Sequence, residues 1–438
     1  MKILIIGQGG REHALAWKAA QSPLTEKVWV APGNAGTALE EKISNINIEA
    51  NDIPQLINFV KKESIDLTIV GPEVALAAGV VNSFNQNNLL CFGPTKEAAR
   101  LETSKAFCKD FLHQHRIPTA DYAIFTKEKE ALEYLETQKF PIVIKADGLA
   151  AGKGVVIAEN IHDAKQAVKD ILTTNLFGSA GNRIVIEEFL TGFELSYIVV
   201  TDGVHILPLA SSQDHKRLKD FDLGPNTGGM GAYSPAPQLS PPLENRILSE
   251  IIEPVIQGLK TEGIPYIGFL YAGLMIDNNQ PKVLEFNCRL GDPEAQPILI
   301  RLKNDLVDLC MKTLNKQLNS VQAKWDERPA LTVVMTAGGY PQDYKRGDII
   351  QGLEKTEDPD CKVFHAGTKK IGNNIVTDGG RVLSVTVLGD NFIEAQQKAY
   401  SIINTIDWPL AHYRHDIGQQ AINFLNTKAI SSGSEFLL

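Results

Sequence analysis

A glycine-rich turn in the middle of the chain contains one lysine and follows a strand that ends near another. This segment gives the clearest indication of a chemical function. An apolar run ends at Lys145, the turn Gly148–Gly154 carries Lys153, and a run of β-branched residues follows. A Walker loop would need one more residue before its lysine, a hydroxyl residue in place of Gly154 and a helix afterwards. The pattern instead predicts a strand, a mobile turn and a second strand, in which backbone N–H groups and both lysines bind nucleotide phosphates. A plain flexible hairpin is the simpler interpretation.

A later strand carries two oxygen ligands. From Lys282 the residues alternate, which places Glu285 and Asn287 on one face and apolar side chains on the other. Carboxylate and amide oxygens suit Mg²⁺, which takes water and ligand phosphates as its other ligands. Arg289 lies on the same side and could bind a carboxylate or a developing oxyanion, which makes it, with Lys145, a candidate catalytic residue. An exposed polar strand face would give the same alternation.

Paired acids end another predicted strand. The apolar residues 184–186 lead into Glu187 and Glu188, and Glu194 follows. A strand that connects two domains can bind adenine through backbone groups and leave a carboxylate for the ribose hydroxyls. Paired acids at a strand end are more often solvated surface, so this segment gains its meaning from the lysine-bearing turn before it.

The chain begins with a strand, a glycine loop and a helix. Gly9 and Gly10 belong to this loop, in which glycines let the backbone approach a phosphate and the helix start supplies N–H donors. A dinucleotide fingerprint fails twice, because Glu12 stands at the third glycine position and the second strand ends at Pro32 without an acid for a ribose hydroxyl. We therefore expect a phosphate site, with a bare tight turn as the alternative. Two further loops at the same sheet edge favour a bound ligand, and they contain Gly33, Asn34, Gly36, Gly71, Pro72 and Glu73.

A long connection joins the later strands. Residues 212–217 (SQDHKR) and 224–231 (GPNTGGMG) are too rich in glycine to form a regular element, and long loops in compact domains tend to be functional. His215, between Asp214 and Lys216, could be read as catalytic. An amine that attacks a phosphate-activated carboxylate needs little base catalysis, so we interpret His215 as structural or positioning.

The arrangement of these segments predicts three domains. Alternating apolar runs and helical patterns over residues 1–103 predict a doubly wound parallel sheet with ligands beyond the carboxyl ends of its strands. Residues 104–315 form the second domain, in which a small α+β unit at about 121–189 carries the glycine-rich turn as a mobile lid. A polar linker precedes an α+β domain at 327–425, and Ile430–Leu438 is predicted to be a frayed tail.

Composition and charge narrow the function classes. The 438 residues are 43% hydrophobic and 22% charged, with a net charge of −9 and no block of consecutive basic residues. General nucleic-acid binding therefore lacks its electrostatic footprint. No window has the apolar length of a membrane span, no signal pattern precedes the first loop, and the five scattered cysteines suit a reducing compartment rather than structural zinc. We expect a cytoplasmic monomer that binds small molecules, with no membrane and no nucleic-acid partner.

A strand-borne lysine, a glycine lid, paired acids on a connecting strand and the Glu-x-Asn pair together resemble the ATP-grasp superfamily. Within it, the chain is similar from about Met1 to Gly418 to the phosphoribosylamine–glycine ligases of de novo purine synthesis. The resemblance rests on seven segments in one order: residues 7–13 (GQGGREH), 31–37 (APGNAGT), 69–73 (IVGPE), 145–154 (KADGLAAGKG), 212–216 (SQDHK), 224–231 (GPNTGGMG) and 285–294 (EFNCRLGDPE). It implies an ATP-grasp fold between the N-terminal sheet and the C-terminal domain.

The resemblance also implies roles for individual residues. ATP would be bound by Lys105, Lys145, Lys153, Glu187, Glu188, Leu190 and Glu194. The metal ion, Mg²⁺ or Mn²⁺, would be held by Glu285 and Asn287. Phosphoribosylamine and glycine would be bound by the N-terminal loops with Asp214, Lys216, Arg289 and Gly291. ATP would phosphorylate the glycine carboxylate, and attack by the amine would release glycinamide ribonucleotide, ADP and phosphate.

Three rival functions stay open at this point. Another ATP-grasp carboxylate–amine ligase or carboxylase would share the nucleotide residues, so only the N-terminal loops and the segment around Asp214 separate it. A nicotinamide-dependent oxidoreductase is disfavoured by the missing ribose acid. A nucleotide sensor without turnover is disfavoured by Glu285 and Asn287, because binding alone needs no metal on the transferred phosphates.

Overall fold

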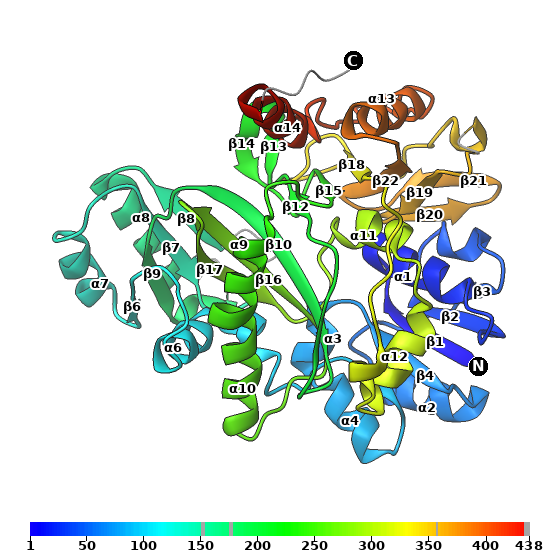
Figure 1. The fold of residues 1–438 in the computed structure, drawn as a ribbon, viewed down its shortest axis with the longest axis horizontal. Helices are drawn as coiled ribbons and strands as arrows, with labels where there is room; N and C mark the ends of the chain where they lie inside the picture. Colours follow the sequence, from blue (N-terminus) through cyan, green and yellow to red (C-terminus); the bar gives the residue numbers. More distant parts are fainter. Residues whose placement is uncertain (150–153, 175–177, 356–357, 433–438) are drawn as a thin grey trace.

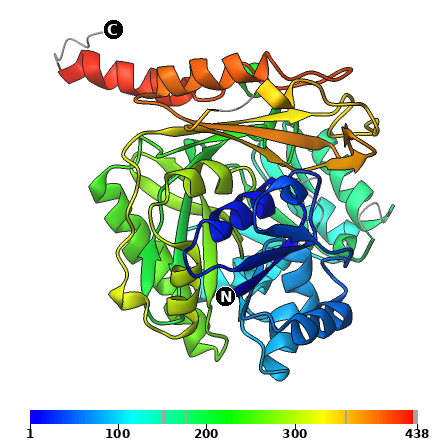
Figure 2. The same cartoon turned by 90° about the vertical axis from the view of Figure 1, so that its right-hand side faces the viewer.

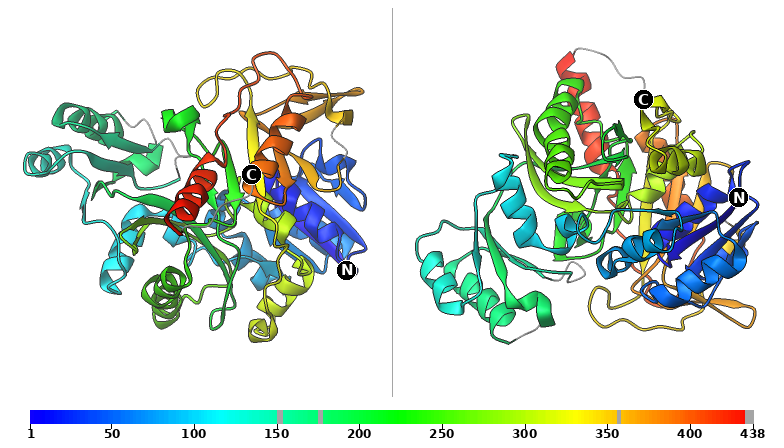
Figure 3. Two further views of the ribbon diagram at one scale, coloured as in Figure 1. Left: turned by 45° about the horizontal axis from the view of Figure 1, so that its top comes forward. Right: turned by 90° about the horizontal axis from the view of Figure 1, so that it is seen from below.

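The computed structural model describes residues 1–149, 154–174, 178–355 and 358–432. These residues form four sheets of four or five strands, two small two-stranded ribbons and the helices around them (Figure 1). The N-terminal sheet and the lid lie at opposite ends of the molecule with a central sheet between them (Figures 1 and 3). The C-terminal sheet and its helices lie across the N-terminal sheet (Figure 2).

The N-terminal sheet is parallel, with the strand order β3-β2-β1-β4-β5. Alternate residues of its first strand pack in two different layers, Ile3 and Ile5 against helix α1 and Leu4 and Ile6 against the helices of the other face. The predicted doubly wound sheet is thereby confirmed, because both faces are covered. The strands are β1 (Lys2–Gly7), β2 (Lys27–Pro32), β3 (Ile43–Asn45), β4 (Leu67–Val70) and β5 (Cys91–Phe92), and the helices are α1 (Gly10–Ala20), α2 (Ile53–Glu63), α3 (Glu73–Ala78), α4 (Val80–Gln86) and α5 (Arg100–Thr103).

The lid is an antiparallel sheet of order β6-β9-β7-β8 with two helices. It follows helix α6 (Lys105–Gln114) and consists of β6 (Tyr122–Phe125), α7 (Glu128–Leu135), β7 (Ile142–Ala146), β8 (Val155–Ala158), α8 (Ile161–Leu172) and β9 (Ile184–Glu188). Lys145 pairs with Val155 across β7 and β8, so the two predicted strands are confirmed. The turn residues 150–153, Lys153 among them, lie outside the described residues.

The central sheet is antiparallel, with the order β11-β10-β16-β17. It is built from β10 (Phe193–Thr201), β11 (Ile206–Pro208), β16 (Gly268–Asp277) and β17 (Gln280–Asn287), with the helices α9 (Pro241–Ile247), α10 (Glu253–Thr261), α11 (Ala295–Arg301) and α12 (Leu306–Leu314). The pairing of β16 with β17 shifts by one residue at Leu284. After this bulge Phe286 is buried while Glu285 and Asn287 are half-exposed, which agrees with the predicted alternation.

The C-terminal sheet has the order β12-β15-β18-β22-β19. Its strands are β12 (Gln213–Asp214), β15 (Gly231–Ser234), β18 (Ala330–Thr336), β19 (Cys361–His365) and β22 (Arg381–Leu388). Two ribbons extend from it, β13 (Arg217–Lys219) with β14 (Leu223–Asn226) and β20 (Thr368–Ile371) with β21 (Asn374–Thr377), and the helices are α13 (Phe392–Ile403) and α14 (Gln419–Ser432).

Two expectations about irregular segments were wrong. The glycine-rich connection forms β12 to β15, and β15 is fully buried in the C-terminal sheet. Gly231 makes this possible, because an added Cβ atom there would lie 2.7 Å from the Thr332 carbonyl oxygen of the neighbouring strand. The frayed tail also begins later than predicted, since α14 continues through Ile430 to Ser432. Residues 433–438 lie outside the described residues.

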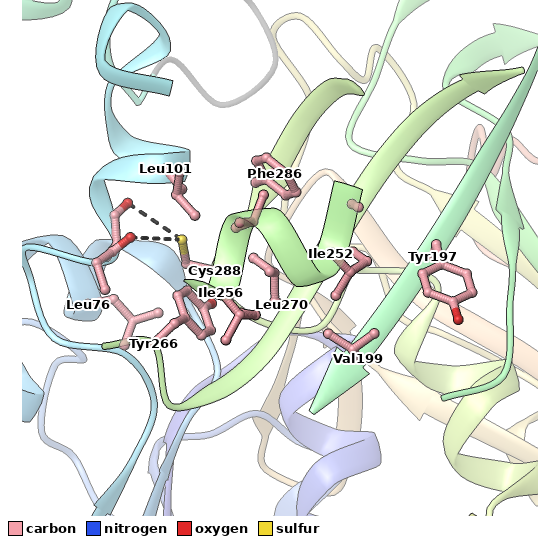
Figure 4. Packing of buried hydrophobic residues seen from close by; sticks show 14 of the residues in the cluster. Leu76, Leu101, Tyr197, Val199, Ile252, Ile256, Tyr266, Leu270, Phe286 and Cys288 are labelled. Carbon is pink, nitrogen blue, oxygen red and sulfur yellow. Dashed lines mark hydrogen bonds between the residues drawn. The ribbon is translucent and has the colours of Figure 1, made fainter. Parts of the chain in front are cut away.

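The hydrophobic cores run through several of these units. One cluster joins Leu76 and Leu101 of the N-terminal part to Tyr197, Leu270 and other residues of the central sheet (Figure 4). Cys288 lies at this joint, with its Sγ 3.6 Å from the Ala99 carbonyl oxygen. The lid, by contrast, has a core of its own between Ala131 and Ile186. Within the described part of the chain, no helix is both long and apolar enough to cross a membrane.

Candidate active site

The structure brings the three predicted glycine loops together at one edge of the N-terminal sheet. Strands β2, β1 and β4 are neighbours, so the residues after their carboxyl ends lie side by side. Gly7 pairs with Pro32, and the Gly71 N–H donates to the Ile6 carbonyl at 3.0 Å. This is the edge at which open α/β sheets bind their ligands.

Glu12 closes the first loop from inside. Its Oε2 accepts the Gly9 N–H at 2.6 Å, as part of a capping box at the start of α1. The same side chain fills the space beside Gly7 and Gly71, where added Cβ atoms would lie 2.3 and 2.2 Å from it. An acid at the third position of the glycine pattern is therefore a structural part of the loop.

Asn34 holds the second loop in shape. Its Oδ1 accepts the N–H groups of Gly36 and Thr37 at 2.9 and 3.0 Å. Its Nδ2 donates to the carbonyls of Gln8 and His365, at 2.8 Å each. Since both oxygen lone pairs and both amide hydrogens are engaged, the side chain fixes the loop against the C-terminal sheet.

Arg289 is held between two carboxylates from the N-terminal part of the chain. Its Nε donates to Glu73 Oε2 at 3.1 Å, and its Nη2 lies 2.7 Å from Glu102 Oε1. Glu102 is itself fixed, because its Oε2 accepts the Cys288 N–H at 2.7 Å. Although burial opposes ionisation, the guanidinium groups of Arg289 and Arg11 hold the pKa of Glu73 at about 2. The arginine is thus oriented by charged partners and keeps N–H donors for an anionic ligand.

Lys145 lies beside Glu187 at the root of the lid. Its Nζ is 3.0 Å from both carboxylate oxygens of Glu187, and it donates to the Leu284 carbonyl at 3.3 Å. That carbonyl belongs to the bulge residue of β17, and bulges free backbone groups from the strand ladder. A second lysine, Lys109, lies 2.8 Å from the same carboxylate.

Glu285 lies where several positive charges meet. Burial opposes its ionisation, but Lys216, Lys105 and Lys145 hold the pKa of Glu285 below its ordinary value. The Lys216 Nζ lies 3.9 Å from Glu285 and 2.6 Å from Glu194. Burial raises the pKa of Asp214 well above its usual range, against the pull of Lys216. Three of the predicted nucleotide and substrate residues, Lys105, Lys145 and Lys216, therefore lie around this carboxylate.

The donor set around Glu285 fits a divalent cation held jointly by protein and substrate. Glu285 supplies an ionised carboxylate, and Asn287 supplies an amide oxygen from the same strand face. Among the described residues, no group of three or more histidine, cysteine, aspartate or glutamate side chains could hold a metal ion. Two oxygen ligands suit Mg²⁺, which usually completes its shell with water and phosphate oxygens.

The remaining predicted residues lie around these groups at different places. Glu188 is exposed, with Lys282 3.7 Å away, and so lies apart from Glu187. Leu190 is buried. The Lys105 Nζ donates to the Glu102 carbonyl at 3.3 Å. Gly291 gives room to Glu294, whose Oε2 would lie 2.3 Å from an added Cβ atom.

His215 is not part of this cluster. Neither of its ring nitrogens has a hydrogen-bond partner among the described residues, and its ring packs edge-on to Tyr233 at 5.8 Å. Burial and the nearby Arg414 lower the pKa of His215 to about 4. A neutral, buried ring agrees with the structural or positioning role expected for it.

Two residues of the site carried no recognised signal in the sequence. Glu102 lies in α5, and nothing in its neighbourhood points to a partner at position 289. Lys109 does have a possible signal, since it lies four residues after Lys105 in α6 and so shares its side of the helix. Asp292, which belongs to the singled-out segment 285–294, lies beside the first loop, because its Oδ2 accepts the Arg11 N–H at 3.4 Å and lies 3.4 Å from Arg381.

Comparison with known families gives a consistent match along the chain. Residues 1–102 match the model of the phosphoribosylglycinamide synthetase N domain, and residues 103–295 match that of its ATP-grasp (A) domain. Residues 330–420 match the C domain of the same family.

Relatives and solved structures agree with these models. The chain is 59% identical to the phosphoribosylamine–glycine ligase of Allochromatium vinosum and 58% identical to that of Escherichia coli K12, over 96% of its own length and 99% of theirs. A crystal structure of phosphoribosylamine–glycine ligase from Thermotoga maritima superposes with a TM-score of 0.81 at 32% identity, over 95% of this chain and 100% of that one. The biotin carboxylase domain of Hydrogenobacter thermophilus 2-oxoglutarate carboxylase shares the fold, with a TM-score of 0.72 at 14% identity over 93% and 90% of the two chains.

Proposed function

The chain belongs to the phosphoribosylglycinamide synthetase family, as its sequence predicted, and from that premise we infer how its residues divide the work of ligation. The protein is an ATP-dependent ligase that joins glycine to 5-phosphoribosylamine in purine biosynthesis. ATP phosphorylates the glycine carboxylate to glycyl phosphate and leaves as ADP. The amine of phosphoribosylamine then attacks the acyl carbon, and phosphate leaves with the formation of glycinamide ribonucleotide. The alternative of another ATP-grasp ligase or carboxylase is disfavoured by the N-domain match.

The assignment of sites rests on one observation: positively charged side chains surround Glu285. We assign the nucleotide phosphates to Lys105 and Lys145, with Lys153 as a third lysine by its position in the turn. The segment that joins β9 to β10, with Glu188, Leu190 and Glu194, binds adenine and ribose. Cations fixed on a rigid strand stabilise the charge that develops on a transferred phosphoryl group, and they need no reorganisation during the reaction.

We further propose that Glu285 and Asn287 hold Mg²⁺ or Mn²⁺. When bound there, the ion neutralises charge on the phosphate oxygens of ATP. The support for this assignment is the ionised state of Glu285 and the shared strand face of the two side chains.

The substrates are assigned to the N-terminal loops, Arg289 and the segment around Asp214. The phosphate of phosphoribosylamine binds at the N-terminal loops around Gly9, Gly10 and Gly71, beside the start of α1, where a helix N-terminus suits an anion. Arg289, oriented by Glu73, binds the glycine carboxylate and then the oxyanion of the tetrahedral state. Asp214 and Lys216 complete the pocket for the amine.

We also propose that the enzyme works as a monomer in the cytoplasm. All residues assigned above come from a single chain, and its five cysteines are free thiols, as a reducing compartment maintains them. Light scattering of the purified protein tests the first point, and fractionation of cells that express it tests the second.

The experiment that tests the function measures ADP release with Mg²⁺ and freshly made phosphoribosylamine, with and without glycine. Rapid ADP release that requires both substrates is expected. Equal ADP release when glycine is replaced by bicarbonate would favour the carboxylase alternative, and release that does not need glycine would contradict the order of steps.

A further inference from the structure

One buried carboxylate at the root of the lid has two lysines. Glu187 is 3% exposed, and its Oε2 lies 2.8 Å from the Nζ of Lys109. The Nζ of Lys145 lies 3.0 Å from both oxygens of the same carboxylate. Lys109 is also buried at 3% exposure, and Lys145 at 8%. Two cations and one anion are therefore enclosed together.

The two lysines differ in how firmly they are held. Lys109 donates to Thr119 Oγ1 at 2.7 Å, and that hydroxyl donates to the Val283 carbonyl at 2.7 Å. Lys109, a residue of α6, is therefore linked through Thr119 to β17. Lys145 has Glu187 and the weaker contact to the Leu284 carbonyl at 3.3 Å. Of the two, only Lys145 has been assigned to the nucleotide.

We propose that Lys109 is a positioning residue: it is the permanent counterion of Glu187 and thereby leaves Lys145 free to pass to the nucleotide phosphates. The inference rests on the proposed role of Lys145 in ATP binding. A buried carboxylate without a counterion is strongly disfavoured, so Glu187 must keep at least one cation in every state. With Lys109 present, Lys145 can leave the carboxylate without stranding it. Without Lys109, ATP and Glu187 compete for the same ammonium group.

The connections of Lys109 fit this role. It lies one helical turn after Lys105 in α6. The same helix therefore positions Lys105, which is assigned to the nucleotide phosphates, and Lys109, which allows Lys145 to leave Glu187 for those phosphates. Its link through Thr119 reaches the strand that carries Glu285. A lysine with a merely structural role would need the carboxylate but would have no effect on the affinity for nucleotide.

The test is a double-mutant cycle read by titration with a non-hydrolysable ATP analogue and Mg²⁺. In Lys109→Met, Lys145 is the sole cation of Glu187, and we expect the Kd of the analogue to rise about tenfold or more, the effect of losing one charge-assisted contact. In Lys109→Met/Glu187→Gln the competing carboxylate is also gone, and the Kd should return to within about threefold of wild type. Lys260→Met, at an exposed lysine of α10, controls for the loss of one positive charge.

The outcomes separate this inference from the proposed function. A Lys109→Met protein that folds and binds the analogue as wild type does would overturn the inference, and so would a double variant that binds no better than the single one. If Lys109→Met fails to fold, Lys109→Gln takes its place, because an amide can still donate to Glu187 and Thr119 without a charge. Failure of the wild-type protein to bind the analogue would instead reject the nucleotide site itself.

Discussion

The Nε of Arg289 donates to Glu73 Oε2 at 3.1 Å, which joins the third N-terminal loop to the strand end that carries Glu285 and Asn287. Glu73 and Arg289 are 216 positions apart in the sequence. This bond helps to fix the orientation of the guanidinium that we propose binds glycine.

Replacing Glu73 by glutamine keeps an oxygen acceptor and removes the charge that orients Arg289. We expect kcat/KM for phosphoribosylamine and glycine to fall by about tenfold to a hundredfold, the range for a group that positions an electrostatic stabiliser. The KM for ATP should stay within about threefold of wild type. Steady-state kinetics with each substrate varied in turn measure both, and Glu41→Gln, at an exposed glutamate, is the control. An equal loss for ATP would contradict the assignment.

Replacing Lys145 by alanine removes a cation from the nucleotide phosphates. We expect kcat to fall by about two orders of magnitude. The fold should survive, because Glu187 retains Lys109 at 2.8 Å as its partner. Turnover and a thermal unfolding scan are measured on the same sample. A folded variant with near-normal kcat would remove Lys145 from the nucleotide site.

Replacing Gly9 by valine should weaken the binding of phosphoribosylamine rather than that of ATP. An added Cβ atom would lie 2.8 Å from the capping oxygen of Glu12 and 3.1 Å from Asp292 Oδ2, so the loop has to shift. The KM for phosphoribosylamine should rise by about tenfold or more, while ATP affinity stays within a few-fold. Gly9→Ala should show a smaller change in the same direction. Equal weakening of both ligands in a folded protein would show that this loop does not belong to one substrate.

Replacing Glu285 by alanine should impair turnover and metal use rather than the binding of phosphoribosylamine. The variant loses the ionised ligand proposed for Mg²⁺, so kcat should fall and the Mg²⁺ concentration for half-maximal rate should rise. Binding of phosphoribosylamine should change less. Titration of Mg²⁺ at saturating substrates gives the comparison, with Asp277→Ala, at an exposed end of β16, as the control. An unchanged Mg²⁺ dependence would reject Glu285 as a metal ligand.

Acid should destabilise the protein through its buried histidines. Burial lowers the pKa of His215 to about 4 and, with His13 nearby, that of His365 to about 3. In the unfolded chain both rings titrate near 6.5, so below that pH the unfolded state binds protons that the folded state does not. Stability should therefore fall as the pH drops from about 6.5 toward 4, by up to about 1.4 kcal/mol per pH unit for each ring.

The measurement is the free energy of unfolding in urea across this pH range. His215→Phe should flatten the dependence, because it removes one of the two groups. His162→Gln, at an exposed histidine, should leave the slope unchanged. A slope in His215→Phe equal to that of the wild type would mean that the ring is not buried in its neutral form.

Elements whose residue pattern lies within one continuous segment were predictable from the sequence. The continuous apolar runs of β1 and β4 are strands because both of their faces are buried, and Glu285 and Asn287 share a face because a strand alternates. Strand β15 was missed because its stability comes from pairing with β18, to which its glycine gives close access. The partners of Arg289 and Glu187 could not be predicted, since these ion pairs join elements that only the tertiary fold brings together.

The lid has a hydrophobic core of its own, between Ala131 and Ile186, and the C-terminal domain has another, between Leu331 and Ile417. The two remaining cores are shared by the N-terminal and central sheets. A size change at Ile144 of the lid can be compensated by a neighbour within the same unit. A size change at Leu270 has to be matched by residues more than a hundred positions away, such as Leu76. In evolution, the lid can therefore diverge or be exchanged between relatives as one module, while the N-terminal and central units are bound to change together.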